Sequence, residues 1–385
     1  MSAVSTKANN VFNTLKNLNE GFGSYMILAM ILTILFIVIT YIIRITQLNK
    51  TECNFMNTLY PSINGNISPI TSGVADLSGN LYDYYVKTAY NACSGGSYKN
   101  DVVDICNLKA VIKQGVRCLD FEIYSIDNSP VVSTSTSESF YVKETFNSVP
   151  FASVMKTIQD YAMGSPGTTT SSASLTCPNS SDPLIIHLRF KSNNQQMYSK
   201  LAEIFKQYQS YMLDGTYSYE NHGRNIGVMP LLNFQNKIIL IVDKNNNSFL
   251  DNTDFMEFVN LTSSSVFMRA YPYHEVSNVQ DIVELTTYNK TATTIVLPDN
   301  GVNPANPSGM LSREMGCQMV AMRYQYVDAL LEENTAFFNR CGYAFCLKPQ
   351  RLRNVVITVA EPTPQKPELS YATRNIATDF YNFDI

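Results

Sequence analysis

The sequence predicts an α/β protein that consists of a TIM-type (β/α)8 barrel and one N-terminal transmembrane helix. Its 385 residues are enough for one large domain with appendages. An apolar run without a charged residue lies close to the start of the chain. From about Leu81 onward, helix-like and strand-like segments alternate over roughly 280 residues, the size at which a (β/α)8 barrel is the commonest α/β fold.

The apolar run, YMILAMILTILFIVITYII, covers residues 25–43. As a helix it would be about 29 Å long, which matches the hydrocarbon core of a bilayer. The preceding region is long and weakly basic, and no small-residue cleavage site follows, so a removed signal peptide is disfavoured. We therefore predict an N-terminal tail over residues 1–24 and a transmembrane helix over residues 25–47, with the lipid bilayer as its partner.

Neither flanking charges nor cysteines tell which side of the membrane holds the rest of the chain. Lys7 and Lys16 on one side balance Arg44 and Lys50 on the other, so the positive-inside rule gives a tie. The eight cysteines show no zinc-ligand spacing, and their redox state stays open. Asn is so common that the N-x-S/T sequons are about as many as chance would give, and glycosylation stays open too.

Residues 48–80 are polar, with Pro, Gly and Ser, and are predicted to be a tether. The barrel is predicted over residues 81–360 and a polar C-terminal tail over residues 361–385. Within the barrel, periodicity and turn residues predict the following order: helix 101–115, strand 119–125, helix 151–163, loop 164–183, strand 183–190, helix 195–208 and strand 237–243.

The overall charge excludes one class of partner. The chain carries 28 basic and 32 acidic residues, a net charge of −4. Nucleic-acid binding needs a basic face, so we expect no nucleic-acid partner. The sequence does not indicate a protein partner.

The stretch VRCLDFEIYS, residues 116–125, places two carboxylates inside a strand that otherwise looks buried. Asp120 and Glu122 are two positions apart, so both side chains point to the same face of the strand. Two like charges in a protein interior require a metal, a catalytic role or an internal cation.

Two later segments resemble the second half of the catalytic barrel of eukaryotic phosphoinositide-specific phospholipases C. They are GCQMVAMRYQ and FFNRCGYAFCLKP, residues 316–325 and 337–349. Three earlier segments resemble its first half: KTAYNAC, GVRCLDFEIY and PLIIHLRF, residues 87–93, 115–124 and 183–190. The resemblance follows the family order over about residues 81–350. It implies a PLC-like phosphodiesterase barrel, that is, a phosphoric diester hydrolase of lipid metabolism.

That family uses two catalytic histidines, a calcium ion held by Asn, Glu, Asp and Glu, and cationic and hydroxyl side chains for substrate. The resemblance places the two histidines at Tyr90 and Thr134. It places the metal ligands at four positions, Asn91, Asp120, Glu122 and Arg189. Four substrate-binding positions fall on Ile241, Asp243, Ile295 and Leu297.

These substitutions predict a barrel that has lost catalysis. Each positioned acid or base contributes about 10²–10⁴-fold, and both histidines are absent. We predict a membrane-anchored structural or binding protein. The anchor and the AT-rich style of composition suggest a membrane protein of a large DNA virus, in a virion or host membrane. The alternative is an active phosphatidylinositol-type phosphodiesterase that uses substitutes such as His187 or Tyr90; His222 and His274 do not fall on family positions.

Arg189 answers the question of the paired carboxylates. Its guanidinium, in place of the last calcium ligand, is predicted to bond both Asp120 and Glu122. Two other interpretations remain: a weakened calcium site built from Asn91, Asp120 and Glu122, and simple solvent exposure. We predict no metal and no cofactor, with calcium only if the ancestral site is retained.

Overall fold

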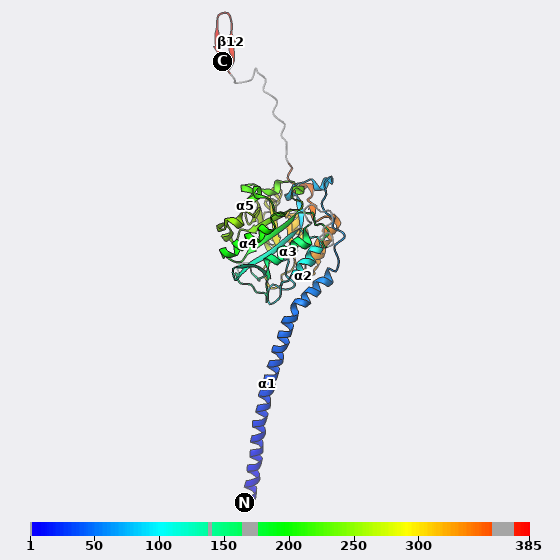
Figure 1. Ribbon diagram of the computed structural model, residues 1–385, viewed down its shortest axis with the longest axis vertical. Helices are drawn as coiled ribbons and strands as arrows, with labels where there is room; N and C mark the ends of the chain where they lie inside the picture. Colours follow the sequence, from blue (N-terminus) through cyan, green and yellow to red (C-terminus); the bar gives the residue numbers. More distant parts are fainter. Residues whose placement is uncertain (1, 138–140, 164–175, 356–372) are drawn as a thin grey trace. The chain divides into compact units, whose positions relative to one another are not determined.

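The computed structural model describes residues 2–137, 141–163, 176–355 and 373–385 (Figure 1). The chain divides into two units, Met1–Arg353 and Asn354–Ile385. The larger unit contains the long N-terminal helix and the barrel. The smaller unit contains an antiparallel hairpin of β12 (Asn375–Ala377) and β13 (Asn382–Asp384).

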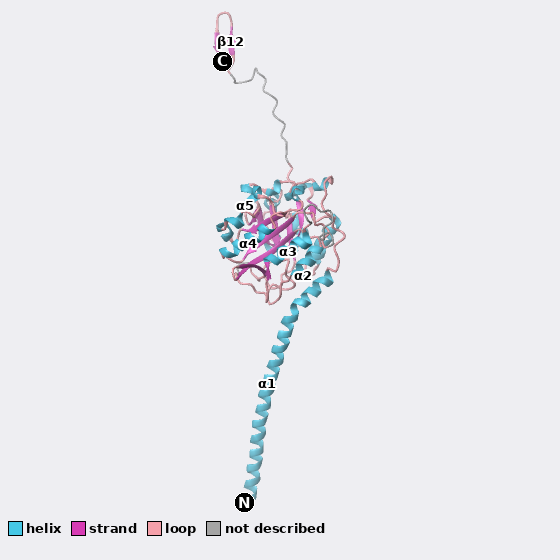
Figure 2. Cartoon of the chain, viewed as in Figure 1, coloured by secondary structure: helices cyan, strands magenta, loops and turns pink. Residues whose placement is uncertain are grey.

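Eight parallel strands form the barrel and confirm the predicted fold (Figure 2). They are β1 (Tyr84–Ala89), β2 (Cys118–Ile126), β5 (Leu184–Phe190), β6 (Ile238–Asp243), β7 (Leu261–Ser263), β8 (Met268–Pro272), β9 (Thr293–Leu297) and β10 (Met319–Met322). Their order is β7-β6-β5-β2-β1-β10-β9-β8, and within the described residues no ladder joins β7 to β8. Three antiparallel strands extend the sheet: β3 (Ser129–Ser133) pairs with β2, β4 (Val149–Pro150) pairs with β3, and β11 (Phe345–Leu347) pairs with β1.

Nine α-helices follow the long N-terminal helix in the described residues, and several of them have capping residues at their ends. They are α2 (Ile105–Lys113), α3 (Phe151–Ala162), α4 (Gln195–Gln207), α5 (Ser218–Gly223), α6 (Thr253–Met256), α7 (Tyr273–Ser277), α8 (Ile282–Tyr288), α9 (Gly309–Glu314) and α10 (Ala329–Cys341). Side chains of Asp104, Asn194 and Asp328 accept bonds from the first turns of α2, α4 and α10. Gly342 ends α10 with φ 83°, a conformation that glycine adopts without strain. Every helix and strand predicted between residues 101 and 243 is present within a few residues of its expected bounds.

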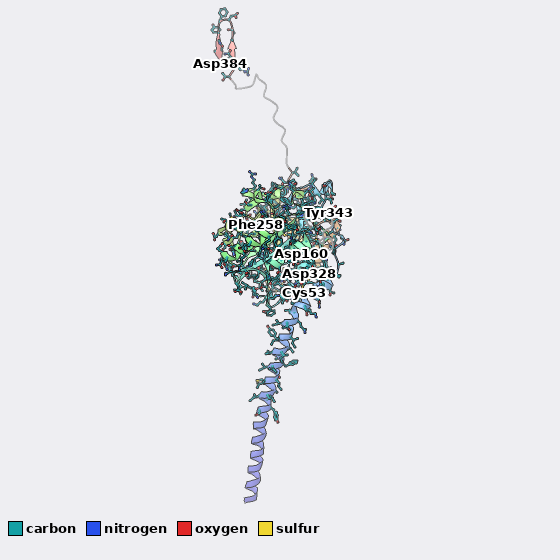
Figure 3. All side chains as sticks on the ribbon, viewed as in Figure 1. Cys53, Asp160, Phe258, Asp328, Tyr343 and Asp384 are labelled. Carbon is teal, nitrogen blue, oxygen red and sulfur yellow. A yellow bond between two sulfur atoms is a disulfide. The ribbon has the colours of Figure 1, made fainter. Side chains whose placement is uncertain are left out.

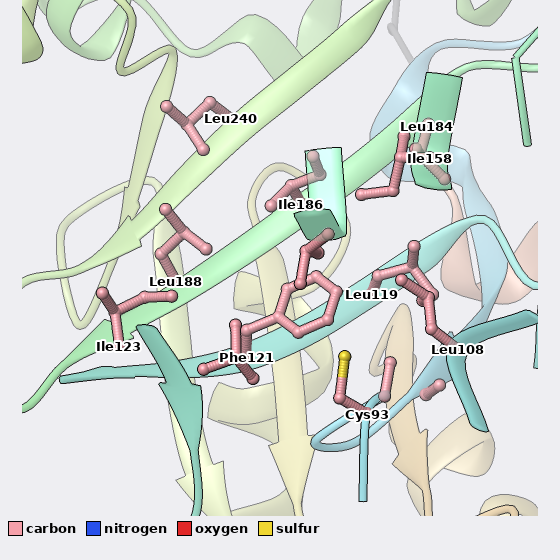
Figure 4. Close-up of a cluster of buried hydrophobic side chains, with 14 of the residues drawn as sticks. Cys93, Leu108, Leu119, Phe121, Ile123, Ile158, Leu184, Ile186, Leu188 and Leu240 are labelled. Carbon is pink, nitrogen blue, oxygen red and sulfur yellow. The ribbon is translucent and has the colours of Figure 1, made fainter. Parts of the chain in front are cut away.

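Side chains of the barrel strands β2, β5, β6, β9 and β10 alternate between two cores. Leu119, Phe121 and Ile123 of β2 pack under the surrounding helices with leucines and isoleucines of β5 and β6 (Figure 4). Cys118 belongs instead to a core that also includes Ile239 and side chains from β5, β9 and β10. Side chains from all of these strands can meet only in the barrel interior. Cys118 therefore points inward, and so do the residues two and four positions after it on the same strand.

One continuous helix, α1 (Ser2–Leu59), precedes the barrel. By length and composition, its part from Gly23 to Leu59 can cross a membrane. The apolar side chains over residues 25–43 are exposed, as a lipid-facing surface requires. The segment predicted as an N-terminal tail, residues 1–24, is part of this helix from Ser2 onward.

The C-terminal end of α1 is fixed to the barrel. A disulfide joins Cys53 to Cys106 in the first turn of α2, where Figure 3 labels Cys53 at the end of α1. The Tyr60 hydroxyl donates to the backbone oxygen of Tyr324, which follows β10. Both contacts lie at the end of the barrel where the parallel strands finish, here called the carboxyl end.

The predicted polar tether over residues 48–80 differs from the structure. Its first part belongs to α1, and its second part runs along the barrel with Ile67, Ile70 and Leu77 buried. The composition concealed these few apolar side chains among polar neighbours. The segment therefore packs on the barrel over part of its length and joins the barrel to α1. Most of the predicted loop over residues 164–183, and the boundary at residue 360, lie outside the described residues.

Candidate functional site

The candidate site is built by two neighbouring parallel strands, β2 and β5. Their register places Asp120 beside His187 and Glu122 beside Arg189. All four side chains have the inward parity and are at least 97% buried. Two carboxylates from one strand therefore face a histidine and an arginine from the next strand inside the barrel.

Arg189 lies between the two carboxylates. Its Nε and Nη2 atoms donate to the two oxygens of Asp120 at 3.0 and 2.8 Å, a bidentate contact. Its Nη1 atom lies 3.1 Å from Oε1 of Glu122, close enough for an ion pair. Nη2 also donates to Oδ1 of Asn91 at 3.2 Å. These contacts are the ones that the salt-bridge interpretation of the sequence predicts, and burial excludes the interpretation of simple solvent exposure.

Neutral donors occupy the remaining carboxylate oxygens. Oε2 of Glu122 accepts bonds from the Tyr124 hydroxyl at 2.7 Å and from the backbone amide of Ser135 at 3.1 Å. Asn91 donates through its side chain to Glu122 and through its backbone to Asp120, both at 3.2 Å. Asn91 has φ 42°, a left-handed conformation that Asn tolerates better than most residues. Every carboxylate oxygen of the pair thus has a partner from the protein, either the Arg189 guanidinium or a hydrogen-bond donor.

His187 continues the network away from Arg189. Its Nδ1 atom lies 2.7 Å from Oδ1 of Asp120, and its Nε2 atom lies 2.8 Å from the Ser263 hydroxyl. That hydroxyl donates to Asp243 at 3.2 Å, as does the Ser264 hydroxyl at 2.9 Å. A chain of hydrogen bonds therefore runs across β2, β5, β7 and β6 and fixes the imidazole on both sides.

The pKa values of the ion pair support the charged state of both partners. Burial alone would raise the pKa of Asp120, but the Arg189 charge and the hydrogen bond from His187 outweigh it and hold this pKa below its ordinary value. Burial would lower the pKa of Arg189, but Asp120 is the main group that raises it well above its ordinary value. The network is therefore an ion pair and not a proton-sharing pair.

The two positions that correspond to the family's histidines lie near the ion pair but hold no imidazole. The ring of Tyr90 stacks on Arg189, with the guanidinium carbon 4.6 Å from the ring centroid. Burial raises the pKa of the Tyr90 hydroxyl well above 10. Thr134 donates to the backbone oxygen of Tyr98 at 3.2 Å and so holds a neighbouring loop. Neither side chain is a base at neutral pH.

The predicted substrate positions are split between two environments. Ile241, Ile295 and Leu297 are buried among the apolar side chains of the barrel interior. Asp243 instead lines a small polar cavity of about 260 Å³, together with Arg189 and residues of the loops that follow β5 and β6. The structure brings Asp243 toward the ion pair, whereas the three apolar positions have no hydrogen-bonding group to offer a phosphate.

His222 and His274 lie outside the site. His222 is in α5. His274 is exposed and contacts Asp299 through Nδ1 at 2.7 Å. Sequence reasoning missed Tyr124, Ser135 and Ser263 as members of the network. Tyr124 has the same inward parity as Glu122, and a serine run at the end of β7 was the available signal for Ser263.

The residues present do not fit a calcium ion. A calcium site needs six to eight oxygen ligands around the cation. Here a guanidinium lies between the carboxylates, and both oxygens of Asp120 already accept hydrogen bonds. The position of the last family ligand supplies a cation rather than an oxygen. We therefore derive no chemical step through a metal.

The fold and this site define a PLC-like (β/α)8 barrel. The X domain of phosphatidylinositol-specific phospholipase C matches residues 77–244, and the Y domain matches residues 249–351. The two matches are consecutive and cover most of the barrel. The chain therefore belongs to the phosphatidylinositol-specific phospholipase C family.

Solved structures agree on the fold. PLC21 of S. officinalis has 17% sequence identity with this chain and PLC21 of L. pealei has 18%, each with a TM-score of 0.56. Each match covers 73% of this chain but only 38% of the other, so the chain spans little more than a third of either protein. No curated protein sequence matches the chain significantly.

Proposed function

We propose that this protein is a membrane-anchored PLC-like barrel without phosphodiesterase activity, which serves as a structural or binding protein. The observation that carries the proposal is Arg189, whose guanidinium bonds both carboxylates where the family's metal ligands fall. A cation that belongs to the protein cannot leave to make room for a metal and a phosphodiester.

The surrounding side chains support the same proposal. Cleavage of a phosphodiester by the adjacent inositol hydroxyl needs a general base and a general acid near the scissile bond. The only nearby imidazole among the described residues, His187, is fully buried, and both ring nitrogens have partners. The Tyr90 hydroxyl has a raised pKa and is a poor base.

The membrane role in the proposal comes from α1. Its apolar stretch is exposed along its length, and its end is covalently fixed to the barrel. A viral membrane, in a virion or in the host, is the setting that we propose from the composition and the anchor together.

Activity is the direct test. The full-length chain in mixed micelles, with phosphatidylinositol or its bisphosphate and with calcium, should release inositol phosphate at the background rate. A known phospholipase C in the same micelles serves as the positive control. Turnover that disappears in His187→Ala or Tyr90→Phe would overturn the proposal and support an active phosphodiesterase with substitute residues.

A further inference from the structure

A cavity of about 360 Å³ lies between α1 and the carboxyl end of the barrel, away from the ion pair. From α1 it is lined by Tyr41, Arg44 and Glu52, together with two apolar side chains between them. From the loops of the barrel, Lys99 and Asp101 are among the side chains that close it. The cavity thus has one wall on the membrane helix and one wall on the globular domain.

A disulfide and a hydrogen bond beside the cavity hold its two walls together. The disulfide between Cys53 and Cys106 fixes the helix one residue after Glu52. The Asn49 side chain donates to Oδ2 of Asp104 at 2.9 Å. Because both attachments lie beside the cavity, the helix face that lines it has a defined position against the barrel loops.

The cavity begins at the depth of lipid head groups and extends to their aqueous side. The uncharged run ends at Ile43, and Arg44 is the first charged residue after it. Glu52 follows eight residues later, about 12 Å farther along the helix axis. The polar layer on each side of a bilayer is roughly 5–8 Å thick. Arg44 is therefore at the level of the head groups, and the backbone of Glu52 lies on the aqueous side of that layer. Both side chains nevertheless line the same cavity, so one head group that enters it can meet both.

Two charged side chains of α1 that line the cavity have no partner in the part of the chain that the structure describes. Among the described residues, no ion pair or hydrogen bond is formed by the charged groups of Arg44 and Glu52. Lys99 pairs with Glu144 at 2.9 Å, and Asp101 accepts a bond from the Ser97 amide at 2.8 Å. A guanidinium at the membrane level and a carboxylate farther out are thus both available to a ligand.

The pKa of Glu52 indicates that the ligand carries a positive charge near this carboxylate. Burial, with a contribution from Asp101, raises the pKa of Glu52 to about 7. A raised pKa means that the charged carboxylate lacks a stabilising cation in this environment. An ammonium group in the cavity would supply one.

We propose that the cavity binds the head group of an amine-bearing phospholipid, of the phosphatidylethanolamine class, from the leaflet that α1 crosses. The lipid phosphate pairs with Arg44, and the primary ammonium donates hydrogen bonds to Glu52 and Asp101. A head group without an amine would leave Glu52 and Asp101 without an ammonium partner, because the Lys99 ammonium is already in an ion pair. Choline has no N–H to donate. This inference goes beyond the proposed function and rests only on its membrane anchor.

Lipid selection by the full-length chain tests the proposal. The chain is incorporated into nanodiscs that contain equimolar phosphatidylcholine, phosphatidylethanolamine and phosphatidylglycerol, and is then released for native mass spectrometry. We expect one phosphatidylethanolamine to be retained about tenfold over phosphatidylcholine, the ratio that one charge-assisted hydrogen bond supports. Equal retention of all three lipids, or a preference for phosphatidylglycerol, would overturn the proposal.

Matched variants separate the cavity from the anchor. Glu52→Gln and Arg44→Gln should each abolish the selection while the chain still enters nanodiscs and keeps its melting temperature. Lys50→Gln, an exposed position on the same helix that does not line the cavity, should retain it. Selection that survives Glu52→Gln contradicts the assignment. Failure to enter nanodiscs would instead contradict the membrane anchor.

A soluble competitor distinguishes a bilayer lipid from a free phosphate ester. Phosphoethanolamine carries the same charged groups without acyl chains, and at a concentration equal to the lipid it should leave the retained phosphatidylethanolamine in place. Displacement at that concentration would show that the site takes a soluble ligand, and would overturn the assignment to the leaflet.

Discussion

The two ends of the barrel bury cations in different ways. At the carboxyl end, Arg189 is held by the carboxylates of Asp120 and Glu122. At the opposite end, where the strands begin, Lys87 and Lys348 donate to backbone oxygens, and no carboxylate of the described residues bonds either ammonium group. The pKa values follow this difference, because that of Arg189 is raised whereas burial lowers that of each lysine to about 7.

The backbone oxygens that accept from Lys87 and Lys348 both lie at C-terminal ends of helices. Lys87 donates to Gln114 and Lys348 to Asn289, which are the residues that cap the C-terminal ends of α2 and α8. Arg117, buried at the same end, donates to Ala162, the last residue of α3. In a (β/α)8 barrel the helices finish at this end, and a helix C-terminus carries about half a negative charge.

The comparison teaches how differently the two ends stabilise a buried cation. A helix C-terminus is worth about 0.3–2 kcal/mol to a cation, less than the several kcal/mol needed to bury it. A carboxylate pair offers far more, but the pair itself must be stabilised. Arg189 supplies one permanent positive charge, and neutral donors such as Asn91 and Tyr124 stabilise the negative charge that remains.

Reversal of the Arg189 charge should have the largest effect. Arg189→Glu restores the residue type of the family's last ligand and places three carboxylates together, so without metal it should lose more stability than removal of the side chain. Calcium at about a hundred times its Kd should then restore roughly 2–3 kcal/mol by mass action. Calorimetry of the full-length chain with calcium and with chelator measures both. A wild-type protein stabilised by calcium would contradict the placement of Arg189.

Removal of the guanidinium alone is the next largest change. Arg189→Ala should destabilise the barrel by about 3–5 kcal/mol, because two buried carboxylates lose their cation. Arg351→Ala is the matched control, since Arg351 forms an exposed pair with Glu314, and it should cost less than about 1 kcal/mol. Denaturant unfolding compares the two. Similar losses of unfolding free energy in the two variants would show that the buried ion pair contributes no more to stability than an exposed one.

The sequence allowed the ion pair to be predicted because strand parity depends on local pattern alone. The spacing of Asp120 and Glu122 fixed their common face, and the resemblance placed Arg189 opposite them. The contacts of Ser263 and Ser135 depend instead on strand order and loop path, which no local pattern contains. The attachment of α1 was missed for a similar reason, since the disulfide of Cys53 and Cys106 joins segments that are distant in sequence.

Substitution of a buried lysine at the opposite end should stabilise the protein, whereas substitution of Arg189 should destabilise it. Lys87→Met removes a buried charge and should stabilise the protein by about 1–3 kcal/mol at pH 7. The pKa of Lys87 is about 7 in the folded state and about 10.4 when unfolded. The penalty is therefore complete below pH 7 and disappears as the pH rises toward 10.

Stability curves of both proteins at pH 7 and pH 10 test this expectation. The gain from Lys87→Met should be present at pH 7 and absent at pH 10. Lys156→Met, at an exposed position, is the control and should be close to neutral at both. A gain that is independent of pH would mean that packing, and not the buried charge, is what the substitution improves.

The smallest expected effect separates the ring of Tyr90 from its hydroxyl. The ring faces the Arg189 guanidinium, so Tyr90→Phe keeps the cation–π contact and should cost less than about 1 kcal/mol. Tyr90→Leu removes the aromatic face and should cost roughly 1–2 kcal/mol more, beyond any loss of packing. In Arg189→Met the cation–π part of this difference should vanish, because no cation then remains for the ring to contact, and only the loss of packing should be left. Unfolding free energies of these four proteins complete the cycle. If Phe and Leu still differed by the same amount without the guanidinium, the ring would be acting only as a hydrophobic filler, and the carboxyl end would owe its stability to the carboxylates alone.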